Sequence, residues 1–213
     1  MNPTARPSAP GRAGGVPRTL TLVLSVVAGV IVGAVLALGT AILLIAFEVP
    51  AMQTTVNGWS STRQCGEAGN SLLQRAACAW AFPLLNLPEE AIYYATTVDG
   101  AGQTLTGAHS YLLHFPPGGL PPTSAFWSLT MTDPQGHMVA NPSNRYSVGD
   151  RSGLVPNADG SVDIYIQNQA PAGHEANWLP SLSGNFKLWL RAYQPGAAIL
   201  NGAYHVPAVV EGP

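Results

Sequence analysis

The chain carries no charged residue from Leu20 to Phe47, and this apolar run constrains what the rest of the sequence can do. As a helix, its 28 residues would be roughly 42 Å long at ~1.5 Å per residue. The hydrocarbon core of a bilayer is ~30 Å thick, so the run can cross it with some tilt. We therefore predict one transmembrane helix over residues 19–48, with the lipid bilayer as its partner.

The charges on either side of this run predict its orientation. Arg6, Arg12 and Arg18 precede it without any acid, whereas six basic residues and all eleven acids follow it, a formal net charge of −5. Basic residues are retained on the cytoplasmic side of a membrane. We therefore expect a disordered cytoplasmic tail over residues 1–18, which is too poor in apolar residues to pack. The C-terminal part is expected outside the plasma (inner) membrane.

A cleaved secretory signal is the alternative to an anchor. An Arg-flanked apolar run also opens a signal peptide, and Val49-Pro50-Ala51 resembles a small-residue cleavage site. The run is longer than the ~7–15 apolar residues of a signal peptide, which favours a single-pass signal-anchor.

Two glycines in the run, Gly29 and Gly33, form a G-x-x-x-G pair. Such pairs let membrane helices approach closely, so a homodimer through this face is one interpretation. The other is that glycine is simply common in membrane helices.

The 166 residues from Glu48 on are enough for one domain with a sizeable core. Charged residues make up only 9% of the chain, while 23 Gly and 19 Pro favour short strands and turns. Binding to nucleic acid requires clustered Lys and Arg, which this acidic part lacks, so DNA and RNA are excluded as partners.

A helical connecting segment is predicted over residues 49–90. Leu72, Leu73, Ala76, Ala77 and Trp80 approximate one helical face. Asn70 or Ser71 is a suitable N-cap, and Pro83 predicts an end near Ala81.

The two cysteines, Cys65 and Cys78, lie in this same segment. Outside the cytoplasm such a pair tends to form a disulfide. A continuous helix would hold the two residues roughly 20 Å apart, so a bridge requires the chain to turn back near Gly66 and Gly69. Two buried, reduced cysteines are the alternative.

From Ala91 onward the apolar residues recur with a period of two. Val162, Ile164 and Ile166 alternate with polar residues, and 186–193 does the same. Further strands are expected at 92–98, 110–115, 125–132 and, at a sheet edge, 204–210. Short alternating strands between Gly/Pro turns predict a mainly β fold, an antiparallel sandwich or barrel over residues 91–213.

Six motifs in residues 91–210 are similar, in order and spacing, to a bacterial family, the domain of unknown function 1214. They are AFWSLT at 125–130, NPSNRY at 141–146, GDR at 149–151, NADGS at 157–161, EANWLP at 175–180 and LRAY at 190–193. In longer proteins this domain is the C-terminal partner of a 1254 domain, which residues 1–90 do not resemble. The resemblance implies a jelly-roll-like β-sandwich in a short, membrane-anchored form. It brings no established activity, cofactor or catalytic residue.

Motifs for catalysis or metal binding are missing from the sequence. It has no G-x-S-x-G, H-x-H, H-E-x-x-H or C-x-x-C. The five histidines are scattered, and His114, on a strand, is interpreted as a hydrogen-bonded structural residue. We expect no metal and no cofactor.

The best polar cluster consists of Asn141, Asn144, Arg145, Tyr146 and Asp150, with Arg151 beside it and with Asn177 and Trp178 later in the chain. As a ligand site, it would offer a guanidinium fork, an indole wall and amide groups. As a structural feature, it would be a loop held by buried polar groups, for example by an ion pair between Arg145 and Asp150.

A second candidate is the outward-facing row Lys187, Trp189, Arg191 and Tyr193, with Tyr165 beside it. Aromatic rings next to polar groups suit sugar stacking. The alternative, which we favour, is that a loop or the 49–90 segment covers this face.

Three classes of function are compatible with these observations. The favoured one is a cell-envelope binding or accessory module for a glycan, lipid or partner protein, and an open aromatic groove near Trp178 or Trp189 would support it. An envelope hydrolase acting on a carbohydrate or ester would need Asp150 and Asp159, or Ser128 and a histidine, in one cleft. A structural protein would oligomerise through Gly29 and Gly33.

Overall fold

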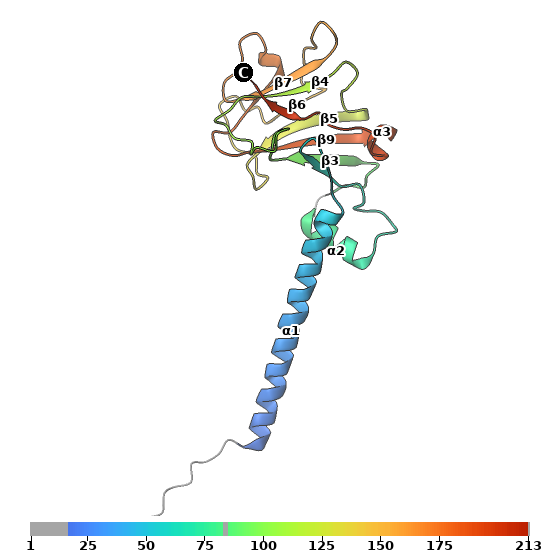
Figure 1. The fold of residues 1–213 in the computed structure, drawn as a ribbon, viewed down its shortest axis with the longest axis vertical. Coiled ribbons are helices and arrows are strands. Elements are labelled where there is room, and N and C mark those ends of the chain that lie inside the picture. The colour runs from blue at the N-terminus through green and yellow to red at the C-terminus, as the bar shows by residue number, and fades with distance from the viewer. Residues whose placement is uncertain (1–16, 83–84, 213) are drawn as a thin grey trace, which may run out of the picture. The chain divides into compact units, whose positions relative to one another are not determined.

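A computed structural model describes residues 17–82 and 85–212 (Figure 1). The chain divides into two compact units, one up to Leu44 and one from Ile45 onward. Most of the predicted tail, residues 1–16, lies outside the described residues.

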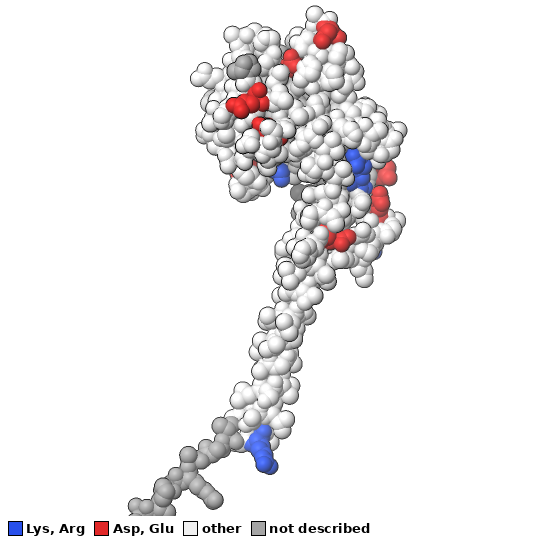
Figure 2. Space-filling model, in the orientation of Figure 1, with Lys and Arg blue, Asp and Glu red and all other residues white. Residues whose placement is uncertain are grey.

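Helix α1 (Arg18–Ala51) contains the whole apolar run. None of its residues is buried, and it is the one helix of the described residues that is long and apolar enough to cross a membrane. Its surface is uncharged above Arg18 in Figure 2, since no Lys, Arg, Asp or Glu occurs between Arg18 and Glu48. The helix continues three residues beyond the predicted end at 48. Pro50 is tolerated there because the amide of Met52 still bonds to the carbonyl of Glu48 at 3.1 Å and closes the last turn.

Helix α2 (Leu72–Ala81) begins and ends where the sequence predicted. Ser71 and Gln74 form a capping box, in which each side chain accepts a hydrogen bond from the other residue's backbone amide. Pro83, which was expected to end the helix, lies outside the described residues. The expected apolar face is only partly buried, because Ala77 is buried whereas Leu72 and Trp80 are exposed.

The predicted disulfide joins Cys65 to Cys78, with a Cα–Cα distance of 5.6 Å. The chain turns back at Gly66, whose φ of +91° is accessible mainly to glycine. The interpretation as two reduced cysteines is therefore wrong.

The 49–90 segment also contains a hairpin that was not predicted, β1 (Thr54–Val56) and β2 (Trp59–Ser61). Asn57-Gly58 connects the strands with φ of +53° and +83°, the geometry of a type I′ turn. The Trp59 indole is buried and donates a hydrogen bond of 2.8 Å to the carbonyl of Pro207. The hairpin is thus part of the β structure rather than a separate connection.

Two sheets form the second unit. The six-stranded sheet has the order β1-β2-β3-β9-β5-β6, with β3 (Ala91–Thr96), β9 (Lys187–Pro195), β5 (Thr123–Thr132) and β6 (Ser147–Gly149). The four-stranded sheet has the order β10-β4-β7-β8, with β10 (Val209–Glu211), β4 (Tyr111–Phe115), β7 (Val162–Gln167) and β8 (Trp178–Pro180). Two short helices, η1 (Glu175–Asn177) and α3 (Ala197–Leu200), precede β8 and follow β9.

The strands pair antiparallel, as predicted, except that β8 runs parallel to β7. A parallel pair needs a crossover connection, and residues 168–177 with η1 supply it. The predicted final strand at 204–210 is shorter than expected, since only its end pairs with β4, at the sheet edge.

One hydrophobic core lies between the sheets. Alternate residues of β7 and β9 enter it, as the period of two predicted, and Phe115 of one sheet contacts Trp127 of the other at a ring distance of 5.6 Å. The predicted mainly β class is therefore confirmed, since the chain has two sheets and one long apolar helix that precedes them in sequence.

Candidate functional site

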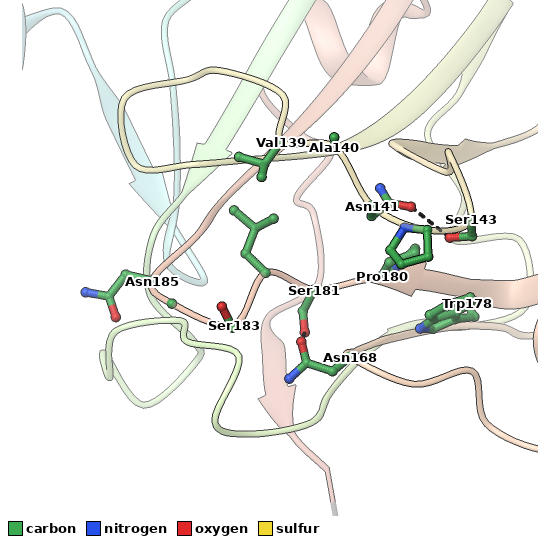
Figure 3. A pocket seen from close by; sticks show the side chains of 13 residues that line it. Val139, Ala140, Asn141, Ser143, Asn168, Trp178, Pro180, Ser181, Ser183 and Asn185 are labelled. Carbon is green, nitrogen blue, oxygen red and sulfur yellow. Dashed lines mark hydrogen bonds between the residues drawn. The ribbon is translucent and has the colours of Figure 1, made fainter.

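A groove of about 570 Å³ lies beside β8 (Figure 3). Three parts of the chain line it: the loop after β5, Asn168 after β7, and the stretch from β8 to β9. In the figure, the loop with Val139 and Asn141 lies on one side and Asn168 and Ser183 on the other. The lining residues are Val139, Ala140, Asn141, Pro142, Ser143, Asn168, Trp178, Pro180, Ser181, Leu182, Ser183, Gly184 and Asn185.

The loop side of the groove is held by the Asn141 side chain. Its Oδ1 accepts hydrogen bonds from the Ser143 hydroxyl at 2.8 Å and from the Arg145 amide at 3.2 Å, while Nδ2 donates to the Arg145 carbonyl at 3.1 Å. Asn144 has a φ of +50°, a conformation that Asn tolerates better than most residues. The Asn-Pro motif therefore makes a closed turn that fixes this wall.

Trp178 forms an apolar part of the lining. Its Nε1 donates a hydrogen bond of 2.8 Å to the carbonyl of Gln167, which fixes the orientation of the ring. The side chain is half-buried, and Pro180 lies on the same strand and also lines the groove. An indole held by its polar nitrogen presents only its apolar surface to a ligand.

The opposite wall depends on a close approach between Gly107 and Leu182. A Cβ on Gly107 would lie 1.6 Å from the Leu182 carbonyl oxygen, so only glycine fits. The Gly107 amide donates to the Gly184 carbonyl at 3.0 Å, and the Ser181 hydroxyl donates to Asn168 Oδ1 at 3.2 Å. These contacts place residues 181–185 along the groove.

The groove is electrically neutral, since its lining contains no Asp, Glu, Lys, Arg or His. Its polar groups are amides and hydroxyls. Ser183 and Asn185 are exposed, and their side chains make no hydrogen bond within the described part of the protein. Those two side chains are therefore available to a ligand.

Of the predicted site residues, Asn141 and Trp178 line this groove. Arg145 lies behind the loop, where Nη1 donates to the Glu175 carbonyl at 2.8 Å and Nη2 to the Ala176 carbonyl. Burial lowers the pKa of Arg145. Its guanidinium thus holds η1 against the loop, and no ion pair joins Arg145 to Asp150, both of which lie in the described part of the chain.

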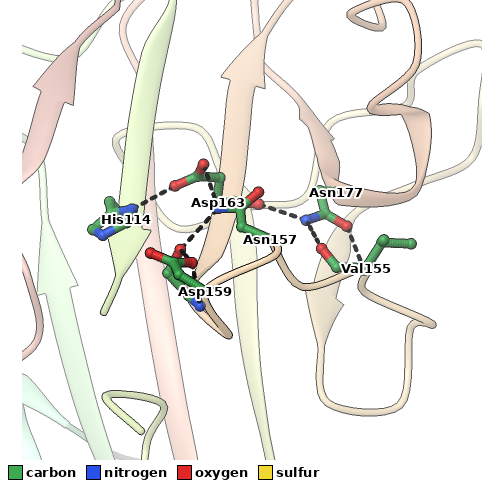
Figure 4. A network of polar contacts seen from close by, with 7 residues as sticks. His114, Val155, Asn157, Asp159, Asp163 and Asn177 are labelled. Carbon is green, nitrogen blue, oxygen red and sulfur yellow. Dashed lines mark hydrogen bonds and ion pairs between the residues drawn. The ribbon is translucent and has the colours of Figure 1, made fainter. Parts of the chain in front are cut away.

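Asn177 is the most buried of the residues predicted to bind a ligand, at 4% exposure (Figure 4). Its amide bonds to both backbone groups of Val155 at 2.8 Å and to the Asp163 carbonyl at 2.8 Å. Both the Oδ1 and the Nδ2 of Asn177 are thus used in hydrogen bonds within the protein, as expected for a residue with a structural role.

The network in Figure 4 continues from Asp163 to His114, which lie 2.6 Å apart at Oδ1 and Nδ1. Asn157 donates to Asp163 Oδ2 at 2.9 Å. This geometry agrees with the interpretation of His114 as a hydrogen-bonded histidine.

The remaining predicted residues stay apart from the groove. Asp150 is exposed and makes no side-chain hydrogen bond in the described chain, and the Tyr146 hydroxyl donates to Asn144 Oδ1 at 3.4 Å. Neighbouring Arg151 lies over the Phe126 ring at 4.5 Å instead.

The second candidate row lies on the outer face of the six-stranded sheet. The Lys187 ammonium is 4.1 Å from the Trp189 ring, and Tyr193 stacks on Phe126 at 4.3 Å. Three residues of the connecting segment, Ala81, Phe82 and Leu85, line a cavity of about 370 Å³ together with Trp189 and Arg191. This segment therefore lies over the face. Tyr165 was expected beside the row, but it is on β7 in the other sheet and packs near His174.

The groups that a hydrolase would need do not converge in the described residues. Asp159 bonds to Ser161, whereas no hydrogen bond joins Ser128 to a histidine or Asp150 to Asp159. No group of three or more His, Cys, Asp or Glu side chains between residues 17 and 212, the gap at 83–84 aside, is arranged to hold a metal ion.

Sequence reasoning missed most of the groove, including Asn168, Ser183 and Asn185. These residues lie on connections between strands and belong to no chemical motif. The one available signal was the polar run SLSGN at 181–185, directly after a Trp-Leu-Pro strand.

Comparison with known proteins gives a family match. The sequence model of a family described as "Protein of unknown function (DUF1214)" matches residues 90–197. The curated proteins contain no match. The crystal structure of the VPA0106 protein from Vibrio parahaemolyticus is similar, with 29% identity, a TM-score of 0.59 and coverage of 66% of this chain. The chain spans 35% of that protein's length. An uncharacterised protein from Burkholderia cenocepacia has 16% identity and a TM-score of 0.35 over 60% of this chain and 30% of its own.

Proposed function

The chain belongs to the DUF1214 family, and from this premise we propose that it is a membrane-anchored binding module of the cell envelope whose groove takes an uncharged glycan. The observation that carries the proposal is the lining of the groove. Trp178 and Pro180 supply apolar surface, while amides and hydroxyls surround them without an ionisable side chain.

The ligand class follows from this chemistry. A pyranose ring has a face of C–H groups and an edge of hydroxyls, so it suits an indole wall bordered by side chains that both donate and accept hydrogen bonds. Asn185 and Ser183 are the groups with free bonding capacity at the exposed end of the groove. A phosphate or carboxylate ligand would have no cation to pair with there, and a lipid chain would leave the amides and hydroxyls of the lining without hydrogen-bond partners.

Anchoring by α1 is the second part of the proposal. The helix is long and apolar enough to span a bilayer, and three Arg residues lie at or before its first turn. Orientation with the C-terminal part outside the inner membrane is supported by the Cys65–Cys78 bridge, since disulfides persist in oxidising compartments. Protease added to spheroplasts should then digest residues after 51 and leave a short protected fragment. Digestion of the N-terminal tail instead would contradict this orientation.

Glycan binding is tested by titrating the full-length protein in detergent micelles with neutral oligosaccharides of glucose and of N-acetylglucosamine. A ligand at one hundred times its Kd raises the free energy of unfolding by ~2.7 kcal/mol, which a thermal shift detects. Asn185→Ala should weaken binding and leave the fold intact, because the side chain is exposed. Trp189→Ala, on the other sheet, is the matched control and should bind normally.

Two outcomes would contradict the glycan assignment. One is the absence of any shift with neutral oligosaccharides while a charged ligand gives one. The other is equal loss of binding in Asn185→Ala and Trp189→Ala, which would place the ligand elsewhere.

The jelly-roll-like strand order, the short form without a 1254 partner and the dimer through Gly29 and Gly33 stay predictions. A side chain at either glycine would meet no atom within 4 Å in the single chain, so the face is open to a second helix. No arrangement within residues 17–82 and 85–212 specifically favours the hydrolase.

A further inference from the structure

The second unit exposes an apolar stripe on α2. Leu72 is 84% exposed and Trp80 is 71% exposed, although large apolar side chains of a short helix normally face the protein. Ala76 and Ala79 are exposed beside them. With 3.6 residues per turn, positions 72, 76, 79 and 80 share one face of the helix.

The opposite face of α2 is already used by the protein. Ala77 is buried, and it forms a small core with Met52 and Cys65. The helix therefore has two apolar faces: one packs against the small core, and the other, the exposed stripe, packs against no part of the described chain. Arg75, on the same helix, is exposed, and its long side chain can reach water from an apolar surface.

The position of α2 is fixed beside the end of α1. Ile45 and Val49, in the last turns of α1, pack against the core formed by Met52, Cys65 and Ala77. All of these residues belong to the second unit. The disulfide from Cys65 to Cys78 holds the middle of α2 to the same place.

We propose that α2 is an interfacial helix, whose stripe of Leu72, Ala76, Ala79 and Trp80 lies in the outer headgroup region of the bilayer. The proposal rests on the proposed anchor. If residues 20–47 cross the membrane, residues 45–52 lie at the interface, and a helix packed on them lies at the same depth. Trp is enriched at that depth, where a helix can lie in the membrane plane with its apolar face in the lipid.

This arrangement would give the protein a second membrane contact. A single helix leaves a domain free to tilt and rotate, whereas two contacts fix its orientation toward the surface. The groove beside Trp178 would then be presented to envelope glycans at a defined angle.

The test uses the full-length protein in vesicles of phosphatidylcholine and phosphatidylglycerol. The emission of Trp80 is obtained as the difference between the wild type and Trp80→Phe. Lipids brominated near the headgroup should quench this emission more than lipids brominated near the chain ends, and aqueous iodide should quench it little. The emission of Trp178, measured with Trp178→Phe, should be insensitive to brominated lipid.

A charge in the stripe gives the matched variant. Ala76→Glu should abolish quenching of Trp80 by brominated lipid, while the disulfide and the melting of the sheets are unchanged, since Ala76 is exposed. Ala170→Glu makes the same substitution at an exposed position far along the chain and should have no effect on Trp80.

The outcomes separate the inference from the anchor on which it rests. Protein that alkaline carbonate strips from the vesicles overturns the anchor and the inference together. Protein that stays bound with an iodide-accessible Trp80 overturns only the interfacial helix. Shielding from both iodide and brominated lipid would assign the stripe to a protein partner and also overturn the lipid contact.

Discussion

Arg145 Nη1 donates a hydrogen bond of 2.8 Å to the carbonyl oxygen of Glu175, thirty residues later in the chain. Nη2 donates to the next carbonyl, that of Ala176. One guanidinium therefore satisfies two backbone acceptors of η1, the turn that leads into Trp178. Arg145, which the sequence suggested as the guanidinium fork of a ligand site, thus holds the backbone that leads into the groove and does not line the groove itself.

Arg145→Ala should lower the free energy of unfolding by ~2 kcal/mol. Hydrogen bonds that involve a charged group contribute ~1.5–3 kcal/mol each, and the Arg145 guanidinium is partly exposed, which reduces their contribution. Arg145→Lys retains the charge without the planar fork, so it should recover only part of the loss. Urea unfolding of both variants measures the effect. Full recovery by Lys would mean that charge, and not the two-carbonyl geometry, is what matters.

Gly107 is predicted to tolerate no side chain. Gly107→Ala places a methyl group against the Leu182 carbonyl and must displace the 181–185 wall, so we expect a loss of ~1–3 kcal/mol, as in overpacked cores, together with weaker ligand binding.

Gly184→Ala is the control for this substitution, because a Cβ there meets no atom within 4 Å. Its unfolding midpoint should stay close to that of the wild type. Equal destabilisation by the two variants would show that lost glycine flexibility, rather than the close approach, is responsible.

The helices and strands that are specified by residues close together in the sequence could be predicted. The alternation of Val162, Ile164 and Ile166 gives β7, and Ser71 with Gln74 caps α2. The β1–β2 hairpin was missed although Asn57-Gly58 is a strong turn signal, because each strand has only three residues and shows no period. The parallel β8 was missed because its pairing depends on a crossover that no local pattern specifies.

The candidate site was only partly predictable for a related reason. Asn141 and Trp178 could be identified as polar and aromatic residues in turn motifs, and both line the groove. Whether a polar side chain serves a ligand or the backbone depends on its distant partners. Arg145 and Asn177 meet theirs across thirty and twenty-two residues, so the sequence left both interpretations open.

The pH dependence near β7 should involve Asp159. Hydrogen bonds from the Ser161 hydroxyl, and then from its amide, lower the pKa of Asp159. A lowered pKa means that the folded state favours the ionised carboxylate. The ionised carboxylate therefore contributes to the free energy of unfolding at pH values above the ordinary Asp pKa of ~3.9. This stabilisation is lost as the pH falls through the lower pKa of the folded state.

Ser161→Ala should raise the pKa of Asp159 part of the way back, since the hydroxyl donor at 2.6 Å is removed and the amide donor at 3.0 Å remains. NMR titration of the carboxyl carbons measures the shift. The pKa of Asp133, which His137 lowers mainly through its backbone amide, should not change in this variant. An unchanged Asp159 midpoint would contradict the assigned cause.

The disulfide should stabilise α2 and leave the sheets unaffected. Its bridge closes a thirteen-residue separation, for which the chain-entropy estimate is ~3 kcal/mol, and α2 otherwise rests on a small core around Ala77. Reduction, or a double Cys65→Ser and Cys78→Ser variant, should therefore increase hydrogen exchange of the α2 amides by up to ~100-fold, the equivalent of ~3 kcal/mol. The amides of β9, central in its sheet, are the internal control and should keep their protection. A uniform loss of protection would show that the bridge stabilises the whole second unit, whereas no change in α2 would show that the capping box and the small core suffice.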